Sequence, residues 1–229
     1  MPAKDQQVKE AIESVLGSTK KGRNKIIRLV KKKYPHLGAS KIRRVYVREG
    51  FSLWKKPRKR VKDNPANPIM VPFNRNEEWA IDFMHDVLET GRTFRSFNVI
   101  DEYNRQALGI LNECSIPARK ATRFLDQLIE KYGKPKRIRG DNGPEMMSKW
   151  FGLWLKERKI TWSAIQKGSP QQNAIIERFN RTYREDVLDA NIFHSIEHAQ
   201  QLTDEWLVEY NTIREHESLN YQTPAAYAA

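Results

Sequence analysis

The sequence is poor in cysteine, lacks long apolar runs, and has few acidic residues in its first quarter. Cys114 is the single cysteine among 229 residues, which excludes an internal disulfide and a four-cysteine zinc site and fits a reducing compartment. No apolar stretch approaches the roughly 20 residues that span a membrane, and no signal-peptide pattern opens the chain. These absences predict a cytoplasmic protein, and a hydrophobic fraction of 39% is enough for a globular core.

The basic residues are concentrated in the first quarter of the chain. Residues 1–62 contain 20 Lys and Arg against 4 Asp and Glu, a balance of +16, whereas residues 63–229 contain 21 basic and 24 acidic residues, a balance of −3. Such a block predicts binding to nucleic acid, because each neutralised phosphate releases condensed counterions. A ribosomal or merely solvated basic arm is the alternative.

Three stretches of this basic block, residues 5–18, 22–34 and 38–50, have apolar residues at helical spacing and are separated by glycine or proline. Three short helices with tight turns predict a helix-turn-helix-like module over residues 1–62. Its core is expected to contain Ile42, Val45 and Tyr46. The basic side chains that the third helix leaves for DNA are Lys41, Arg43, Arg44 and Arg48.

A bare basic cluster, "WKKPRKR", follows the predicted module and is expected either to track phosphates or to stay solvated. Its candidate DNA contacts are Lys55, Lys56, Arg58, Lys59 and Arg60. The next stretch, "DNPANPIMVP", has three prolines in ten residues, which predicts an extended linker over residues 63–76.

Residues 77–229 predict an α/β domain. Three β-rich stretches come first, and helix, short strand, helix, short strand and helix follow in turn. This order predicts a mixed five-stranded sheet flanked by helices, with its first three strands antiparallel. The expected strands lie within residues 78–88, 95–103, 105–116, 134–143 and 160–166, and the expected helices cover residues 117–133, 148–159 and 173–188.

Glu177 stands within an apolar helical pattern without belonging to its apolar face. On a helical wheel, Ile176, Phe179 and Tyr183 share one face, and Glu177 lies on another with Arg181. An ordinary salt bridge between Glu177 and Arg181, worth about 0.2–0.5 kcal/mol, would explain this placement. The alternative is a carboxylate that meets others elsewhere in the fold.

Two aspartates are candidates to meet it. Asp82 lies inside the first predicted strand, and Asp141 ends the fourth at the turn "RGDNG". Carboxylates at strand ends project over the edge of a sheet, where a ligand can approach. Between Asp141 and Glu177 lie 35 residues, which hold one helix, one strand and the loop "KGSPQQN".

These features together resemble the catalytic core of the DDE transposases and retroviral integrases. The resemblance rests on "WAIDF", "GDNGPE", the 35-residue spacing and "SPQQNAIIERFNR", and it covers residues 77–229. Within that superfamily, "WAIDFMHD", "FNVIDEYNRQALGI" and "YNTIREHESLNYQTPAAY" resemble the OrfB-type transposases of the bacterial insertion-sequence-three family, and "GASKIRRVYVREGFSL" resembles the end of their helix-turn-helix region. The resemblance implies a ribonuclease H-like fold.

It also implies a catalytic and metal-binding triad of Asp82, Asp141 and Glu177. Cutting and rejoining a phosphodiester needs an activated oxygen and a stabilised leaving oxygen, which two Mg²⁺ ions about 3.5–4 Å apart can supply through carboxylate ligands. Asp82 would bridge the two ions, and Asp141 and Glu177 would each complete one, with Mn²⁺ as a substitute metal. Further DNA contacts implied near Glu177 are Arg181, Arg184, Gln171, Gln172 and Asn173, although Asn173 equally fits an ordinary helix N-cap.

The implied function is that of a transposase that cleaves insertion-sequence ends and transfers their 3′ ends, which integrates and recombines DNA. Its partners would be double-stranded DNA at the element ends and target, further copies of itself on DNA, and a coiled-coil protein from an upstream reading frame. It would reside in the bacterial cytoplasm and on the nucleoid. The alternatives are a truncated or domesticated DNA-binding relative that blocks transposition, and a ribonuclease H-like nuclease without strand transfer.

Overall fold

The computed structural model describes residues 3–16, 23–51, 72–166 and 170–228. The chain divides into two compact units, Met1–Asp63 and Asn64–Ala229. The basic cluster at residues 54–60, with its five predicted DNA contacts, lies outside the described residues. So do residues 63–71 of the predicted linker.

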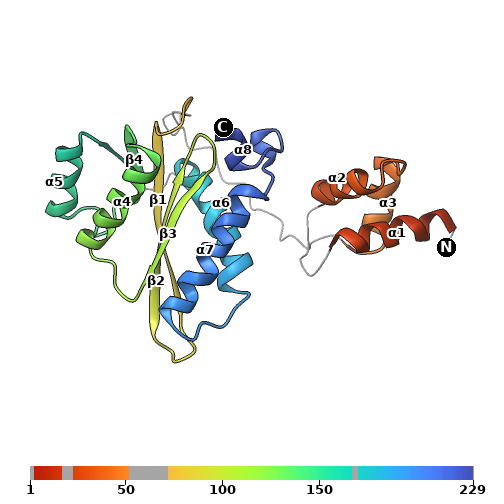
Figure 1. Ribbon diagram of the computed structural model, residues 1–229, viewed down its shortest axis with the longest axis horizontal. Coiled ribbons are helices and arrows are strands. Elements are labelled where there is room, and N and C mark those ends of the chain that lie inside the picture. Colours follow the sequence, from red (N-terminus) through yellow and green to blue (C-terminus); the bar gives the residue numbers. More distant parts are fainter. Residues whose placement is uncertain (1–2, 17–22, 52–71, 167–169, 229) are drawn as a thin grey trace. The chain divides into compact units, whose positions relative to one another are not determined.

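The described part of the first unit is all-helical, which confirms the prediction of helices there. Its helices are α1 (Ala3–Leu16), α2 (Arg23–Lys33) and α3 (Ala39–Arg48) (Figure 1). Their apolar faces share one small core that includes Ile12, Ile26 and Val30. Ile42, Val45 and Tyr46 of α3 are buried in it as predicted, which leaves the basic side chains of α3 outside the core.

The second unit is built on one mixed sheet of five strands. The strands lie in the order β3-β2-β1-β4-β5, with β1 to β3 antiparallel and β4 and β5 parallel to β1. This architecture confirms the predicted sheet and its three leading antiparallel strands. The strands are β1 (Glu78–Val87), β2 (Thr93–Asp101), β3 (Ala107–Glu113), β4 (Arg137–Gly140) and β5 (Thr161–Ala164).

Helices cover both faces of the sheet (Figure 1). On one face α4 (Ala118–Tyr132) and α5 (Lys149–Arg158) pack on strand residues that include Trp79 and Ile81. On the other face α6 (Ala174–Tyr183) and α7 (Ile196–Thr212) pack on Ala80 and Ile100. The remaining elements are the 3-10 turns η1 (Pro170–Asn173) and η3 (Glu217–Leu219), the π-helical turn η2 (Arg184–Leu188) and α8 (Pro224–Ala228).

The end of β4 fits tightly between its two neighbouring strands. A Cβ on Gly140 would lie 2.8 Å from Trp162 of β5 and 2.9 Å from Ile81 of β1, so a larger residue would push the strands apart. Glycine at this position therefore lets β1 and β5 pack closely on the end of β4, just before Asp141. No helix in the described parts of the chain is long and apolar enough to cross a membrane.

Candidate active site

Asp82 lies in the middle of β1, on the face of the sheet that α6 covers. Because side chains alternate along a strand, it shares that face with Ala80 and Met84, which pack with the residues of α6 and α7. Its Oδ1 accepts a hydrogen bond from the backbone N–H of Phe83 at 2.9 Å, and its Oδ2 accepts one from Nδ2 of Asn180 at 2.6 Å. The carboxyl group is therefore held in one orientation.

Asn180 of α6 joins Asp82 to the neighbouring strand. Its Oδ1 accepts a hydrogen bond of 2.7 Å from Nδ2 of Asn98, the β2 residue directly opposite Asp82 in the sheet. Both asparagine side chains are buried. This pair was not predicted as part of the site, although an asparagine on the buried face of an amphipathic helix is a signal that could have found it.

Asp141 follows β4 at an exposed turn. Its Oδ1 accepts a hydrogen bond of 3.1 Å from the backbone N–H of Gly143, which shapes the turn. Glu145, four residues on, forms an ion pair with Arg95 of β2, and Arg95 also lies over the ring of Phe83 at 4.2 Å. Glu145 is therefore engaged with the sheet, while Asp141 remains exposed at the strand end.

Glu177 lies in the first turn of α6 and is exposed. A carboxylate in the first turn is stabilised by the positive end of the helix dipole. Within residues 72–166 and 170–228, Glu177 forms no ion pair, so the salt bridge with Arg181 that the sequence alone would allow is absent. The helix contributes Asn180 to the interior and Glu177 to the exposed edge.

The charges of Asp141 and Glu177 act on the carboxyl group of Asp82. Burial, with the negative charges of Asp141 and Glu177 acting in the same direction, raises the pKa of Asp82 to about 6 against the lowering effect of the hydrogen bonds from Phe83 and Asn180. The sequence-predicted residues from β1, the end of β4 and α6 are thus brought into one field of negative charge. A cation placed there would relieve that repulsion.

The donor set suits a hard divalent cation. Carboxylate oxygens are the ligands that Mg²⁺ and Mn²⁺ prefer, and Asp82, Asp141 and Glu177 supply them from three separate elements. As the described residues are arranged, no group of three His, Cys, Asp or Glu side chains is gathered closely enough to hold a metal ion. The three carboxylates therefore suit a divalent cation by their oxygen ligands and their negative charge.

A buried ionic cluster links β4 to the start of α6, and it too was not predicted. Nη2 of Arg139 lies 2.7 Å from Oε2 of Glu78, and its Nη1 lies 3.1 Å from Oε2 of Glu102. The same Nη1 donates to the backbone carbonyl of Gln172 at 3.1 Å. Arg139 thus ties the strand that leads to Asp141 to the turn that leads to Glu177.

The predicted DNA contacts before α6 are partly engaged within the fold. The side-chain oxygen of Gln172 accepts a hydrogen bond of 2.9 Å from the backbone N–H of Gln166. Asn173 occupies the N-cap position of α6 and is buried, but its side chain makes no capping hydrogen bond. The side chain of Gln171 lies outside the described part of the structure.

Arg184 and Arg181 are the predicted DNA contacts farther along the helix. They differ in whether the fold pairs them with an acidic side chain. Arg184 lies 3.2 Å from Oδ2 of Asp86 and donates to the carbonyl of His85 at 2.8 Å, which fixes it against the end of β1. Arg181 is exposed and pairs with no carboxylate in the described structure. Arg181 is therefore the freer of the two cations.

In the first unit, the carboxylate of Asp5 in α1 pairs with three of the basic side chains of α3. Its carboxylate lies 2.8 Å from Arg48, 3.0 Å from Arg44 and 3.7 Å from Lys41. Arg43 is exposed, and no carboxylate of the described residues pairs with it. Among the four predicted DNA contacts of α3, only Arg43 is thus free of an acidic partner within the described structure.

Known proteins resemble this chain in sequence and in fold. Two integrase core domain models match residues 74–170 and 158–224. A protein of an insertion element from Burkholderia multivorans, called the IS407 uncharacterized 31.7 kDa protein, is 31% identical over 91% of this chain and 75% of its own length. The chain belongs to the DDE transposase and integrase superfamily. The superfamily resemblance seen in the sequence is confirmed.

Other relatives of the superfamily extend this picture. A transposase for insertion sequence element IS904 from Lactococcus lactis is 26% identical over 78% of this chain and 69% of its own length. Among solved structures, the HTLV-2 integrase catalytic core domain in complex with magnesium matches 69% of this chain and 99% of its own, with a TM-score of 0.52 and 19% identity. The simian T-cell lymphotropic virus intasome matches 95% of this chain and 74% of its own, with a TM-score of 0.59 and 15% identity. The predicted ribonuclease H-like fold is confirmed.

Proposed function

We propose that this protein is a transposase that, with Mg²⁺, cleaves DNA at the ends of an insertion sequence and joins those ends to new DNA. The observation that carries the proposal is the electrostatic coupling of Asp82 to Asp141 and Glu177, three carboxylates from β1, the end of β4 and α6. Membership of the superfamily supports it, since relatives are named as transposases and insertion-element proteins.

In this proposal Asp82, Asp141 and Glu177 hold the metal. When bound, a metal pair of this type activates the attacking oxygen and stabilises the leaving one. In cleavage, a water oxygen bonds to phosphorus and the bond to the 3′ oxygen breaks, which leaves a 3′ hydroxyl. In transfer, that hydroxyl bonds to a target phosphorus and displaces a target 3′ oxygen. The chain's own contribution is to orient the carboxylates.

Two buried groups perform that orientation. Asn180 holds Oδ2 of Asp82 and is itself held by Asn98, so α6 and β1 keep a fixed spacing. Arg139 binds the carbonyl of Gln172 just before α6 and so fixes where the helix that carries Glu177 begins. Geometry held by buried partners lowers the cost of reorganisation when charge develops in the reaction.

The DNA contacts and assembly complete the proposal. The basic first unit, with Arg43 foremost, binds duplex DNA sequence-independently, and Arg181 contacts DNA close to Glu177. Further DNA contacts near Glu177 are made by Arg184, Gln172 and Asn173. The protein acts as a homo-oligomer on DNA, with a coiled-coil partner from an upstream reading frame.

The decisive experiment incubates the full chain with labelled duplex DNA carrying the element ends, with Mg²⁺, with Mn²⁺, or with EDTA. Nicked products followed by strand-transferred products, seen with a divalent metal and lost in the Asp82→Asn variant, are the expected result. Binding without any product in either metal would favour a DNA-binding relative that blocks transposition. Cleavage without joined products would favour a nuclease.

A further inference from the structure

A cavity of about 390 Å³ lies beside α6, the helix that carries Glu177. Its wall on α6 is formed by Ala174, Arg178 and Thr182, which recur every four residues and so share one stripe of the helix. The C-terminal end of α7 and residues 214–218 form the opposite wall, and Arg105 enters from the turn between β2 and β3. The cavity therefore joins the helix of the proposed active site to three other segments.

Arg105 is an unusual cation in this position. Its Nη1 is buried and has no hydrogen-bond partner in the described structure, and its backbone has a positive φ of 60°. Burial lowers the pKa of its guanidinium, because desolvation disfavours the charged form. A buried guanidinium nitrogen without a hydrogen-bond partner is costly, even with the charges of Glu102 and Asp101 near enough to act on Arg105, and a phosphate oxygen within reach would remove that cost.

Arg178 brings a second cation to the same cavity. It is exposed, and no acidic side chain of the described residues forms an ion pair with it. Its positive charge contributes to lowering the pKa of Arg105, so the two guanidinium groups are close enough to repel each other. Arg105 and Arg178 both line this cavity, from the turn between β2 and β3 and from α6, so one anion could bind to both of them.

The charge and the apolar surface of the other lining residues indicate which class of ligand the cavity would bind. Three arginines and two glutamates line the cavity, a formal balance of +1, and one of those arginines, Arg214, is already paired with Asp186. Apolar surface comes from Phe179 and Tyr210. A singly charged phosphodiester with its sugar fits this mixture better than a highly charged free anion, which the two glutamates would repel.

We propose that this cavity binds a backbone phosphate of DNA, held between Arg105 and Arg178 beside α6, the helix that carries Glu177. The inference rests on the proposed function in that DNA is taken as the substrate, and it adds a site that positions the strand relative to the carboxylates. Arg178 follows Glu177 in α6, with its side chain about 100° further round the helix, so a phosphate at Arg178 would anchor DNA to the helix that carries Glu177.

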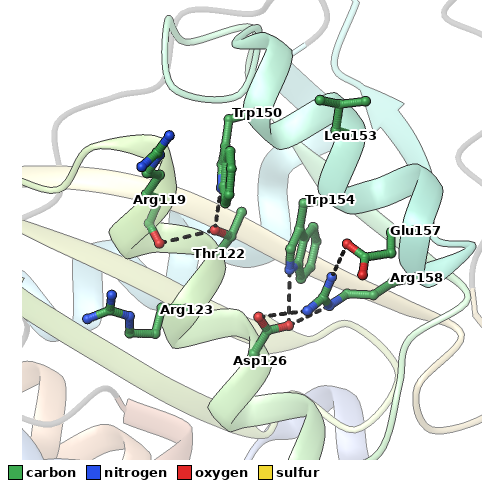
Figure 2. Close-up of a pocket in the computed structure, with 9 residues that line it drawn as sticks. All are labelled: Arg119, Thr122, Arg123, Asp126, Trp150, Leu153, Trp154, Glu157 and Arg158. Carbon is green, nitrogen blue, oxygen red and sulfur yellow. Dashed lines mark hydrogen bonds and ion pairs between the residues drawn. The ribbon is translucent and has the colours of Figure 1, made fainter.

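The test measures binding of the full chain to the element-end duplex in EDTA over a range of salt concentrations. Each phosphate contact contributes about 0.9 to the slope of log affinity against log salt. Arg178→Ala is expected to lower that slope by about 0.9. Its control is Arg123→Ala, which removes the same charge from an exposed arginine of α4, on the opposite face of the sheet, at the pocket that Trp150 and Trp154 line (Figure 2).

Arg123→Ala is expected to leave the slope unchanged. An equal loss of slope in both variants would show a general effect of net charge, and no loss in Arg178→Ala would show that the cavity does not hold a phosphate; either result overturns the proposal. Arg105→Gln removes the cation on the other side of the cavity and should lower the slope in the same way. Thermal unfolding checks that this variant is folded. Because Arg178 is exposed, its variant remains informative even where Arg105→Gln does not fold.

The result is separable from the proposed catalysis. Asp82→Asn should lose cleavage and keep the full salt slope, since EDTA removes any contribution of metal to binding. A normal slope in Arg178→Ala together with active wild-type protein would reject only the phosphate site. A reduced slope in a protein that never cleaves DNA would reject only the transposase.

Discussion

Nδ2 of Asn180 donates a hydrogen bond of 2.6 Å to Oδ2 of Asp82, and this contact joins α6 to β1. Asn98 donates to Asn180 in turn, so the amide of Asn180 has both ends occupied. Asn180 lies three residues after Glu177, one turn along the same helix. The hydrogen bond therefore fixes the helix that carries one proposed catalytic carboxylate against the strand that carries another.

Replacing Asn180 with alanine should slow DNA cleavage strongly and weaken the fold. The change leaves Asn98 without its partner and removes one from Asp82, and an unsatisfied buried polar group costs about 1–3 kcal/mol. Urea unfolding measures the loss of stability, and cleavage of element-end DNA well below the unfolding midpoint measures the loss of activity. Asn191→Ala is the control, because it removes a hydrogen bond of 2.8 Å to Val187 elsewhere on this face. Equal cleavage by the two variants would show that Asn180 has no role in the site.

Replacing Glu177 with glutamine should abolish cleavage and strand transfer while DNA binding stays close to normal. The proposed role of Glu177 needs its charge for the metal, whereas the fold makes no ion pair with it in the described residues. Glu185→Gln is a matched control, since Glu185 is also exposed and follows α6 in η2. A Glu177→Gln protein that turned over as fast as Glu185→Gln would remove Glu177 from the proposed triad.

The sequence predicted the architecture because each element carries its own signal. β-rich stretches mark β1 to β3, and the glycine that ends the helix before β4 stands at Gly133, which has a positive φ of 91°. Asp82, Asp141 and Glu177 were candidates because their positions on predicted elements would meet at one sheet edge. The structure brings their charges close enough to act on Asp82.

The polar interior could not be predicted in the same way. Arg139 reads as one more basic residue beside Arg137, yet the fold buries it between Glu78 and Glu102. These three residues come from β1, the end of β2 and β4, and only tertiary pairing shows that their charges meet. For the same reason, the sequence could not show that Asp5 lies against the basic residues of α3.

The buried cluster around Arg139 predicts a pH dependence of stability. Burial raises the pKa of Glu102 to about 7, with Glu78 adding to the rise and Arg139 opposing it. The folded state then binds a proton on Glu102 between pH 4.5 and 7 that the unfolded state has released, so this residue makes stability fall as pH rises through that window. Glu102→Gln cannot titrate and should lose this contribution.

Urea unfolding of wild type and Glu102→Gln at pH 5 and pH 8 checks the expectation. The stability of the variant relative to wild type should improve from the lower pH to the higher one. Glu130→Gln on the exposed side of α4 serves as the control and should track wild type at both values. A relative stability of Glu102→Gln that stays constant or falls with rising pH would contradict a raised pKa at Glu102.

The distribution of charge in the first unit predicts which basic residues of α3 set its affinity for DNA. Arg43 is exposed and unpaired within the described structure, whereas Arg44 and Arg48 share the carboxylate of Asp5. Arg43→Ala should lower the slope of log affinity against log salt by about 0.9, the loss of one phosphate contact. Arg44→Ala should lower it less, because a guanidinium held by Asp5 is already partly neutralised and replaces fewer counterions when DNA binds.

Asp5→Asn provides the complementary measurement on the same helix. It should steepen the slope by releasing Lys41, Arg44 and Arg48, provided that circular dichroism shows the helices intact. Fluorescence anisotropy with one labelled duplex at several salt concentrations compares all three variants with wild type. If Arg43→Ala and Asp5→Asn both leave the slope unchanged, α3 does not face DNA, and the sequence-independent affinity must come from basic residues elsewhere in the chain, including those at 54–60.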